Sequence, residues 1–182
     1  ETDYFIECLV HPQREAMIHI FFGERAASKV SDIPKDTPIM DIKKAGIIGS
    51  GTMGGGIAMC FANAGIPVHI IDQDADNLKR GISVIEKNYE FMVNRGRMTA
   101  EQKDFVFGLV TSSLDYNDVH DCDIVIEAVY ENLELKTKIF KSLDEAVKPG
   151  AILASNTSGL DIDSIANSTS RPELVVGTPF FS

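Results

Sequence analysis

The segment Gly49-Ser-Gly51-Thr-Met-Gly54 has the residue types and spacing that point most directly to a chemistry. It follows the apolar run 44–48 and has the pattern Gly-x-Gly-x-x-Gly. In dinucleotide-binding folds the first glycine allows a tight turn, and the second lets the backbone approach a pyrophosphate. The third lets a helix pack close to a strand. The N–H groups that begin that helix would then face the phosphates.

A carboxylate stands at the matching distance from this loop. The second apolar run, 68–71, ends in Asp72, which can accept hydrogen bonds from both ribose hydroxyls and would repel a 2′-phosphate. NAD is therefore favoured over NADP. A bare glycine hexamer would also fit a flexible loop, but the strand, helix and acid around it predict a nucleotide site. Methyltransferases and flavoproteins share this first turn and acid, so these residues leave the class of protein open.

Short apolar runs and amphipathic segments alternate along residues 42–182. This alternation predicts an α/β fold of the Rossmann type, a doubly wound, mostly parallel sheet with helices on both faces. The predicted strands are 44–48, 68–72, 109–111, 124–129, 151–155 and 174–178. The predicted helices are 57–64, 78–92, a shorter one after the capping box Thr99-x-x-Gln102, 131–147 and 161–166.

Three further segments follow the ends of predicted strands. Tyr130-Glu131-Asn132 follows the strand 124–129, with Lys136 one helical turn further on. Asn156-Thr-Ser158-Gly159 and Pro179-Phe-Phe-Ser182 follow the last two strands. Ligands of such sheets bind at the carboxyl ends of the strands, where the strand order reverses. These segments and the glycine loop are therefore expected to line one cleft.

Residues 1–41 are predicted to form a helical arm and linker, and residues 42–182 a separate cofactor-binding domain. Pro12 suits the first turn of a helix that reaches about Lys29, and the prolines within 31–41 favour a linker. The apolar side chains of the arm fit two interpretations, which are packing on the following domain or the tail of a preceding one. The chain begins without Met or a signal peptide, so it is expected to be a piece of a longer protein.

Composition excludes several other classes. The formal net charge of −10 argues against a nucleic-acid surface, and no apolar stretch approaches the length of a membrane span. The three cysteines form no CxxC pair, which argues against a disulfide framework and favours a reducing compartment. The four histidines show no metal-ligand spacing, so no metal is expected.

In combination, four segments resemble the NAD-binding domain of the L-3-hydroxyacyl-CoA dehydrogenases of fatty-acid β-oxidation. They are Gly49 to Gly54, Ile126 to Asn132, Ser155 to Ser158 and Gly177 to Ser182. The arm is similar to the segment that follows an enoyl-CoA hydratase domain in multifunctional enzymes. The resemblance implies NAD as cofactor, an acyl-CoA substrate, and oxidation of (S)-3-hydroxyacyl-CoA to 3-ketoacyl-CoA. It also implies a preceding hydratase domain and a helical C-terminal domain beyond residue 182.

The resemblance also implies roles for single residues in cofactor binding. Met53 would lie in the turn under the cofactor, although a core methionine fits that position equally. Asp72 would bind the adenosine ribose. The backbone at Val129 and the carboxylate of Glu131 would lie near the nicotinamide half. Lys136 would lie near the cofactor, whereas a lone lysine on a helix is usually just solvated.

Two further positions concern catalysis. Ser158 matches a serine that contacts the nicotinamide and the substrate oxygen, while spacing alone favours a helix N-cap. Pro179 stands where the family has the histidine that removes the hydroxyl proton. Proline cannot accept a proton, and a positioned general base is worth about 10²–10⁴-fold in rate, or about 3–5 kcal/mol. The chain is therefore expected to bind NAD(H) and to be inactive alone.

Two alternatives remain open. Pro179 fits a catalytically dead module that binds NAD(H) or acts as a scaffold. A methyltransferase is disfavoured by the segments 156–158 and 180–181. The ending Gly177-Thr-x-Phe-Phe-Ser and the arm resemble the peroxisomal type most, while the mitochondrial matrix and the bacterial cytoplasm remain alternatives.

Overall fold

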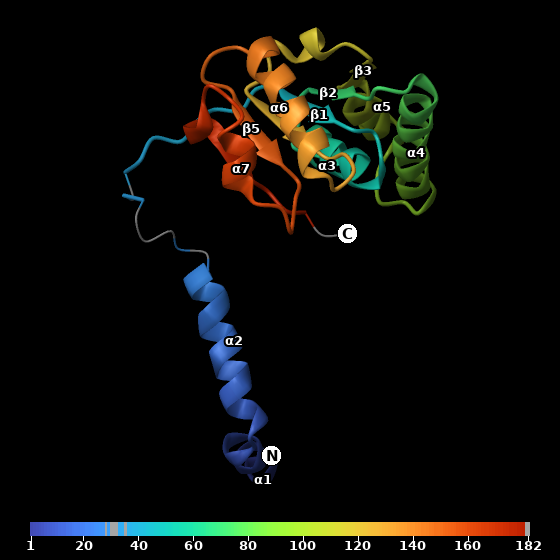
Figure 1. Cartoon of the computed structure of the whole chain (residues 1–182). Helices are drawn as coiled ribbons and strands as arrows, with labels where there is room; N and C mark the ends of the chain where they lie inside the picture. The colour runs from blue at the N-terminus through green and yellow to red at the C-terminus, as the bar shows by residue number, and fades with distance from the viewer. Residues whose placement is uncertain (28, 30–32, 35, 181–182) are drawn as a thin grey trace. The chain divides into compact units, whose positions relative to one another are not determined.

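The computed structural model describes residues 1–27, 29, 33–34 and 36–180. The chain forms two compact units, Glu1–Met40 and Asp41–Ser182 (Figure 1). The first contains two helices, α1 (Thr2–Val10) and α2 (Gln13–Ala27). The interruption follows from Pro12, because the residue before a proline is driven out of the helical region, and His11 is extended with ψ of 136°. None of the residues in α1 and α2 is buried.

The predicted single helix from Pro12 to about Lys29 corresponds to α2, which ends at Ala27. The predicted linker, 31–41, falls partly outside the described residues. Its described part contains no helix or strand. No described helix in either unit combines the length and apolar character needed to cross a membrane.

The second unit is built around a sheet of six strands. These are β1 (Ala45–Ile48), β2 (Val68–Ile71), β3 (Val110–Ser113), β4 (Ile124–Glu127), β5 (Ile152–Ser155) and β6 (Val175–Gly177). Their order is β3-β2-β1-β4-β5-β6, and each neighbouring pair is parallel. This is the strand order of a Rossmann fold, so the predicted fold class is confirmed. The order reverses between β1 and β4, which places a ligand crevice there.

Helices connect these strands. They are α3 (Thr52–Asn63), α4 (Ala75–Asn94), α5 (Ala100–Gly108), α6 (Leu133–Ala146) and α7 (Ile162–Ala166), with the 3₁₀ turns η1 (Tyr116–Val119) and η2 (Pro172–Leu174). The capping box of α5 is confirmed, since Thr99 and Gln102 bond reciprocally. Helix α3 begins at Thr52, before the predicted start at Ile57, because the glycine loop runs directly into its first turn.

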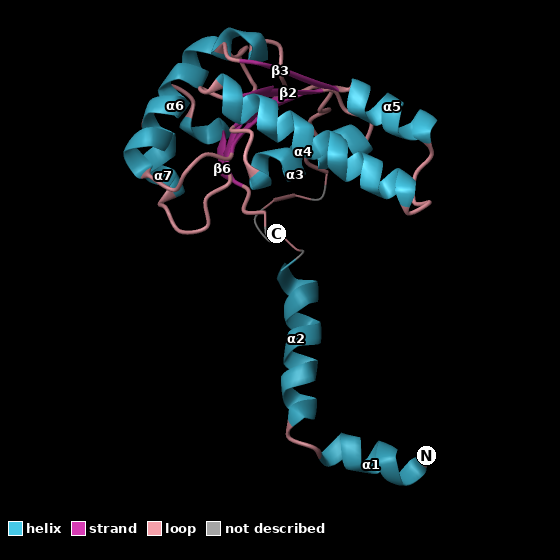
Figure 2. Cartoon of the chain, turned by 90° about the vertical axis from the view of Figure 1, so that its right-hand side faces the viewer, coloured by secondary structure: helices cyan, strands magenta, loops and turns pink. Residues whose placement is uncertain are grey.

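Two apolar layers cover the two faces of the sheet. Successive strand residues alternate between them: Ile47 and Ile126 pack with α3, α4 and α5, whereas Ile48 and Val125 pack with α6 and α7. Figure 1 shows α7 close to α6, and α5 close to α4. Figure 2 shows the strands in the interior of this unit, with helices around them. The sheet is thus buried on both faces, and the edge formed by its strand ends is left for a ligand.

A histidine lies in the sheet away from that edge. His69 on β2 is 9% exposed. Its Nδ1 lies 2.7 Å from Thr111 Oγ1, and its Nε2 lies 2.9 Å from Ser113 Oγ. Burial lowers the pKa of His69. Nearby aspartates raise it and the charge of Lys44 lowers it, and the resulting pKa lies below the ordinary value for histidine. The folded protein therefore holds this ring neutral.

We expect a pH effect on stability from His69. Below about pH 6.5 the unfolded chain binds a proton that the folded chain resists. The free energy of unfolding should therefore fall as the pH is lowered from 7 to about 5.5. Urea denaturation should show a shallower decline for His69→Gln, and His19→Gln on α2 should decline as the unchanged chain does. An identical decline in all three proteins would contradict this assignment.

Candidate functional site

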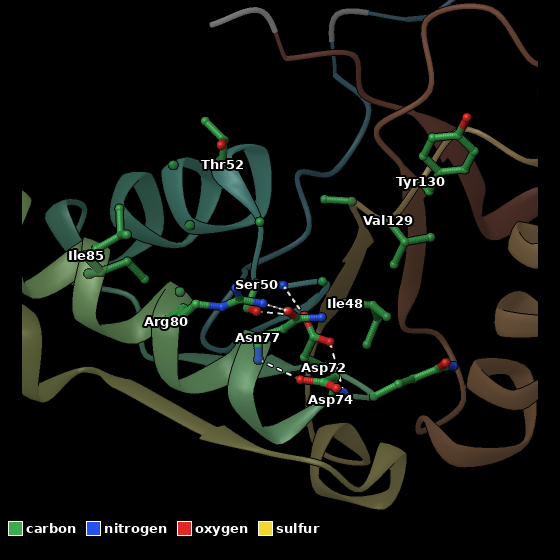
Figure 3. A pocket seen from close by; sticks show the side chains of 18 of the residues that line it. Ile48, Ser50, Thr52, Asp72, Asp74, Asn77, Arg80, Ile85, Val129 and Tyr130 are labelled. Carbon is green, nitrogen blue, oxygen red and sulfur yellow. Dashed lines mark hydrogen bonds between the residues drawn. The ribbon is translucent and has the colours of Figure 1, made fainter.

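A cleft of about 910 Å³ lies at the carboxyl ends of β1, β2 and β4. Its walls are the glycine loop, residues 72–74 after β2, one face of α4 and residues 128–130 after β4. Figure 3 shows Ser50 and Asp72 on one side, and Val129 and Tyr130 on the other. The position is the point at which the strand order reverses, where open α/β sheets bind ligands. The volume suits a cofactor-sized molecule.

The glycine loop has the geometry that its sequence predicts. Gly49 has φ of +102°, which favours glycine. A Cβ on Gly54 would lie closer than 3.0 Å to the Gly49 carbonyl oxygen, so loop and helix touch backbone to backbone. Gly51 is the N-cap of α3 and provides no side-chain cap. The first N–H groups of α3 are therefore available to an anion, and the loop fits a pyrophosphate.

Asp72, directly after β2, is held by Ser50, which follows the neighbouring strand β1. Its Oδ2 accepts from Ser50 N at 2.9 Å and from Ser50 Oγ at 2.6 Å, and its Oδ1 accepts from Asp74 N at 3.2 Å. Burial alone would raise the pKa of Asp72, but these hydrogen bonds outweigh it, and the pKa lies below its ordinary value. The side chain is therefore a carboxylate at neutral pH. It suits ribose hydroxyls and disfavours a 2′-phosphate.

Several cleft residues were not predicted from the sequence. Ser50 occupies a variable position of the glycine motif yet joins the loop to Asp72. Asn77 and Arg80, which hydrogen bond to each other, extend the same side of the cleft from α4. The signal for these two was available, because the first turns of a helix that follows such an aspartate face the strand ends.

The exit of β4 forms the other side of the cleft. Val129 lines the cleft, and its backbone N–H donates to Glu127 Oε1 at 2.7 Å. Its predicted place near the nicotinamide half stays a prediction. Lys136 does not line the cleft. Its side chain is fully buried, and its ammonium lies 2.8 Å from Glu127 Oε1 and 3.2 Å from Glu131 Oε2. The expectation of a solvated lysine is therefore wrong, because two carboxylates enclose this one.

Glu131 is half-exposed and connects two strand exits. It accepts a hydrogen bond from the hydroxyl of Thr157, which follows β5. Burial opposes ionisation, yet the hydrogen bond from Thr157 and the charge of Lys136 lower the pKa of Glu131. Glu131 is thus anionic. It lies beside the lining of the cleft, and its predicted contact with the nicotinamide half stays a prediction.

The remaining predicted residues do not line this cleft. Ser158 is exposed on the turn after β5, and its interpretation as an N-cap is wrong because Asp161 caps α7. Pro179 is exposed after β6, where Phe180 N donates to Asn156 Oδ1 at 2.8 Å. Met53 is partly buried, and Gly54 is buried beneath the loop. Residues 181 and 182 of the predicted strand-end motif lie outside the described residues.

Comparisons with known proteins agree with this geometry. Residues 44–182 match the family model described as "3-hydroxyacyl-CoA dehydrogenase, NAD binding domain". The chain is 40% identical over 190 residues to the peroxisomal bifunctional enzyme of Homo sapiens. It is 37% identical over 186 residues to the peroxisomal fatty acid beta-oxidation multifunctional protein AIM1 of Arabidopsis thaliana. In both cases all of this chain is covered and 25% of the relative, so the chain spans about a quarter of their length.

Solved structures of two dehydrogenases also match this chain. The 3-hydroxybutyryl-CoA dehydrogenase of Escherichia coli matches with a TM-score of 0.76 and 36% identity, over 79% of this chain and 30% of that one. The (S)-3-hydroxybutyryl-CoA dehydrogenase of Ralstonia eutropha matches with a TM-score of 0.75 and 35% identity, over 78% and 50%. The prediction of NAD as cofactor is thereby confirmed. This chain belongs to the family of NAD-binding domains of 3-hydroxyacyl-CoA dehydrogenases.

Proposed function

We propose that this chain is the NAD(H)-binding part of an enzyme that oxidises (S)-3-hydroxyacyl-CoA to 3-ketoacyl-CoA in fatty-acid β-oxidation. The observation that carries the proposal is the pairing of an uncapped helix start at Gly51 with an ionised Asp72 in one cleft. Family membership supports the substrate class. The names of the longer relatives support a place within a multifunctional protein.

Different residues of the cleft bind different parts of the cofactor. The first N–H groups of α3 stabilise the negative charge of a pyrophosphate. Asp72, held by Ser50, accepts from the ribose hydroxyls of one nucleotide half. Val129, which follows β4, lies on the other side of the point where the strand order reverses. The nicotinamide half of the cofactor binds on that side. NAD bound in this cleft would supply the acceptor for the hydride that leaves the hydroxyl-bearing carbon of the substrate.

Pro179 supports a second candidate function. A general base at this position would take the hydroxyl proton as the hydride leaves, and proline has no atom that can do so. A module that binds NAD(H) without catalysis would retain the cleft and lack this group. We therefore propose that the chain itself binds the cofactor and does not turn over the substrate.

Cofactor fluorescence and a turnover assay test these statements together. NADH fluorescence should rise and saturate on titration with the 182-residue chain. Acetoacetyl-CoA reduction should be slower by a factor of about 10² or more than with the E. coli relative used as a positive control. Failure to bind NADH at millimolar concentration would contradict the binding proposal. Turnover close to that of the relative would contradict the claim of inactivity.

Asp72→Ala should weaken NADH binding by about tenfold, because it removes an ionised acceptor for ribose hydroxyls. It should also reduce the preference for NADH over NADPH, because the charge that repels the 2′-phosphate is gone. Fluorescence titration with both cofactors measures the two effects. Asp104→Ala, an exposed aspartate on α5, should leave both affinities unchanged. Unaltered NADH affinity in the Asp72 variant would remove Asp72 from the site.

The partners and the compartment follow from the same proposal. We infer that further domains accompany this one in the full-length protein, because the matched relatives are about four times as long. The family resemblance of the arm and of residues 42–182 supports a hydratase domain before the arm and a helical domain after residue 182. A peroxisomal location is favoured by the names of two of these relatives. Fractionation of source cells tests the location. Co-sedimentation of the full-length protein with a peroxisomal marker is expected, and its recovery with mitochondria or cytosol would contradict it.

A further inference from the structure

We infer that the buried Glu127–Lys136 pair positions the wall of the cleft that receives the nicotinamide half, without touching the cofactor. The inference rests on the proposed function. Glu127 is the last residue of β4, and both side chains are fully buried. Burying two opposite charges costs much of what their attraction returns, and apolar replacements are often equally stable. A gain in stability therefore does not explain this pair, and its role is inferred from its contacts.

Glu127 uses both carboxylate oxygens on groups around the strand exit. Oε1 accepts from Val129 N at 2.7 Å and from Lys136 Nζ at 2.8 Å. Oε2 accepts from Lys136 Nζ at 2.9 Å and from Ser155 Oγ at 2.6 Å. The first of these bonds fixes the peptide between Ala128 and Val129, which lines the cleft. One buried carboxylate thus ties the cleft wall to α6 and β5.

Lys136 carries the connection one step further. Beyond the two oxygens of Glu127, its ammonium lies 3.2 Å from Glu131 Oε2, so its three donors face carboxylates. Glu131 in turn accepts from Thr157, in the turn that leads to Ser158. The exits of β4 and β5 are therefore joined through one buried cation. Lys136 acts on the site by holding Glu131 and Glu127 in place.

The opposite end of β4 offers a comparison. There Asp123 pairs with Lys148 at 2.6 Å, and both side chains are partly exposed. Asp123 Oδ2 also accepts from the backbone N–H groups of Lys43 and Lys44. This pair joins the strand to its neighbours as Glu127 does, but it lies away from the cleft lining. A variant without the Asp123–Lys148 pair therefore shows how the loss of such a pair affects stability without a direct effect on the cleft.

The decisive comparison uses NADH and ADP-ribose, which lacks the nicotinamide. In Glu127→Leu/Lys136→Met the acceptor of Val129 N–H is lost without leaving a buried charge. NADH should bind about tenfold more weakly, and the affinity for ADP-ribose should change by less than about twofold. The control, Asp123→Leu/Lys148→Met, should lose stability in urea and keep both affinities. Calorimetric titration measures all four values.

The single variant Glu127→Gln keeps one acceptor for Val129 N–H and decides the question if the double variant does not fold. It should weaken NADH binding by about threefold and leave ADP-ribose binding unchanged. Equal weakening of both ligands, or unchanged NADH affinity in the folded variant, would overturn the inference. Absence of NADH binding by the unchanged chain would instead overturn the proposed function.

Discussion

Gly54→Ala is expected to abolish NADH binding and to lower the free energy of unfolding by about 3 kcal/mol. The added Cβ would lie closer than 3.0 Å to the carbonyl oxygen of Gly49. That oxygen belongs to the backbone of the turn, so no side-chain rotation relieves the overlap. Helix α3 must move away from β1, and its first N–H groups then no longer converge on the pyrophosphate position. Urea denaturation and NADH fluorescence measure the two losses.

Gly108→Ala is the matched control for this substitution. Gly108 is also helical, at the end of α5, and a Cβ there meets no atom within 4 Å. Alanine should be neutral or stabilise by about 0.4–1 kcal/mol, since it restricts the unfolded chain. If the Gly54 variant bound NADH like the unchanged chain, the close approach of loop and helix would not be a requirement of the site.

Lys136→Met is expected to cost about 3–5 kcal/mol of stability, because it leaves the Glu127 carboxylate buried without its counter-charge. The buried carboxylate would retain only the hydrogen bonds from Val129 N and Ser155 Oγ. Methionine fills nearly the same volume, so the loss reports charge rather than packing. The midpoint of urea denaturation at neutral pH measures it.

Lys148→Met provides the comparison at the other end of the same strand. The Lys148 side chain is 41% exposed, and breaking such a pair typically costs about 1 kcal/mol or less. Equal losses in the two methionine variants would show that burial does not distinguish the pairs. Glu127 and Lys136 would then contribute no more to stability than a partly exposed ion pair does.

Local signals made most of the fold predictable. The alternation of apolar runs and amphipathic segments indicated each strand of the sheet, and Thr99 with Gln102 marked the start of α5. The tight turn at Gly49 and the position of Asp72 beside the glycine loop were predictable because they depend on short spacing and backbone geometry. The shorter turns η1 and η2 were missed, since three or four residues carry no periodic pattern.

Contacts between distant segments were not predictable in the same way. The bond between Ser50 and Asp72 requires β1 and β2 to be neighbours in register, with Ile48 beside Ile71. The burial of Lys136 depends on the helix face that α6 turns toward the sheet. A signal for it existed, because Glu127 ends an apolar strand, and a buried carboxylate requires a nearby cation.

Mapping backbone amide shifts during NADH titration tests the central claim most directly, namely that the cleft at the ends of β1, β2 and β4 binds the cofactor. The largest shifts are expected at residues 49–52, 72–74 and 128–130, which line that cleft. The amides of α5, none of whose residues lines the cleft, should stay unchanged. Saturable shifts confined to other residues, or no shifts at millimolar NADH, would contradict the claim.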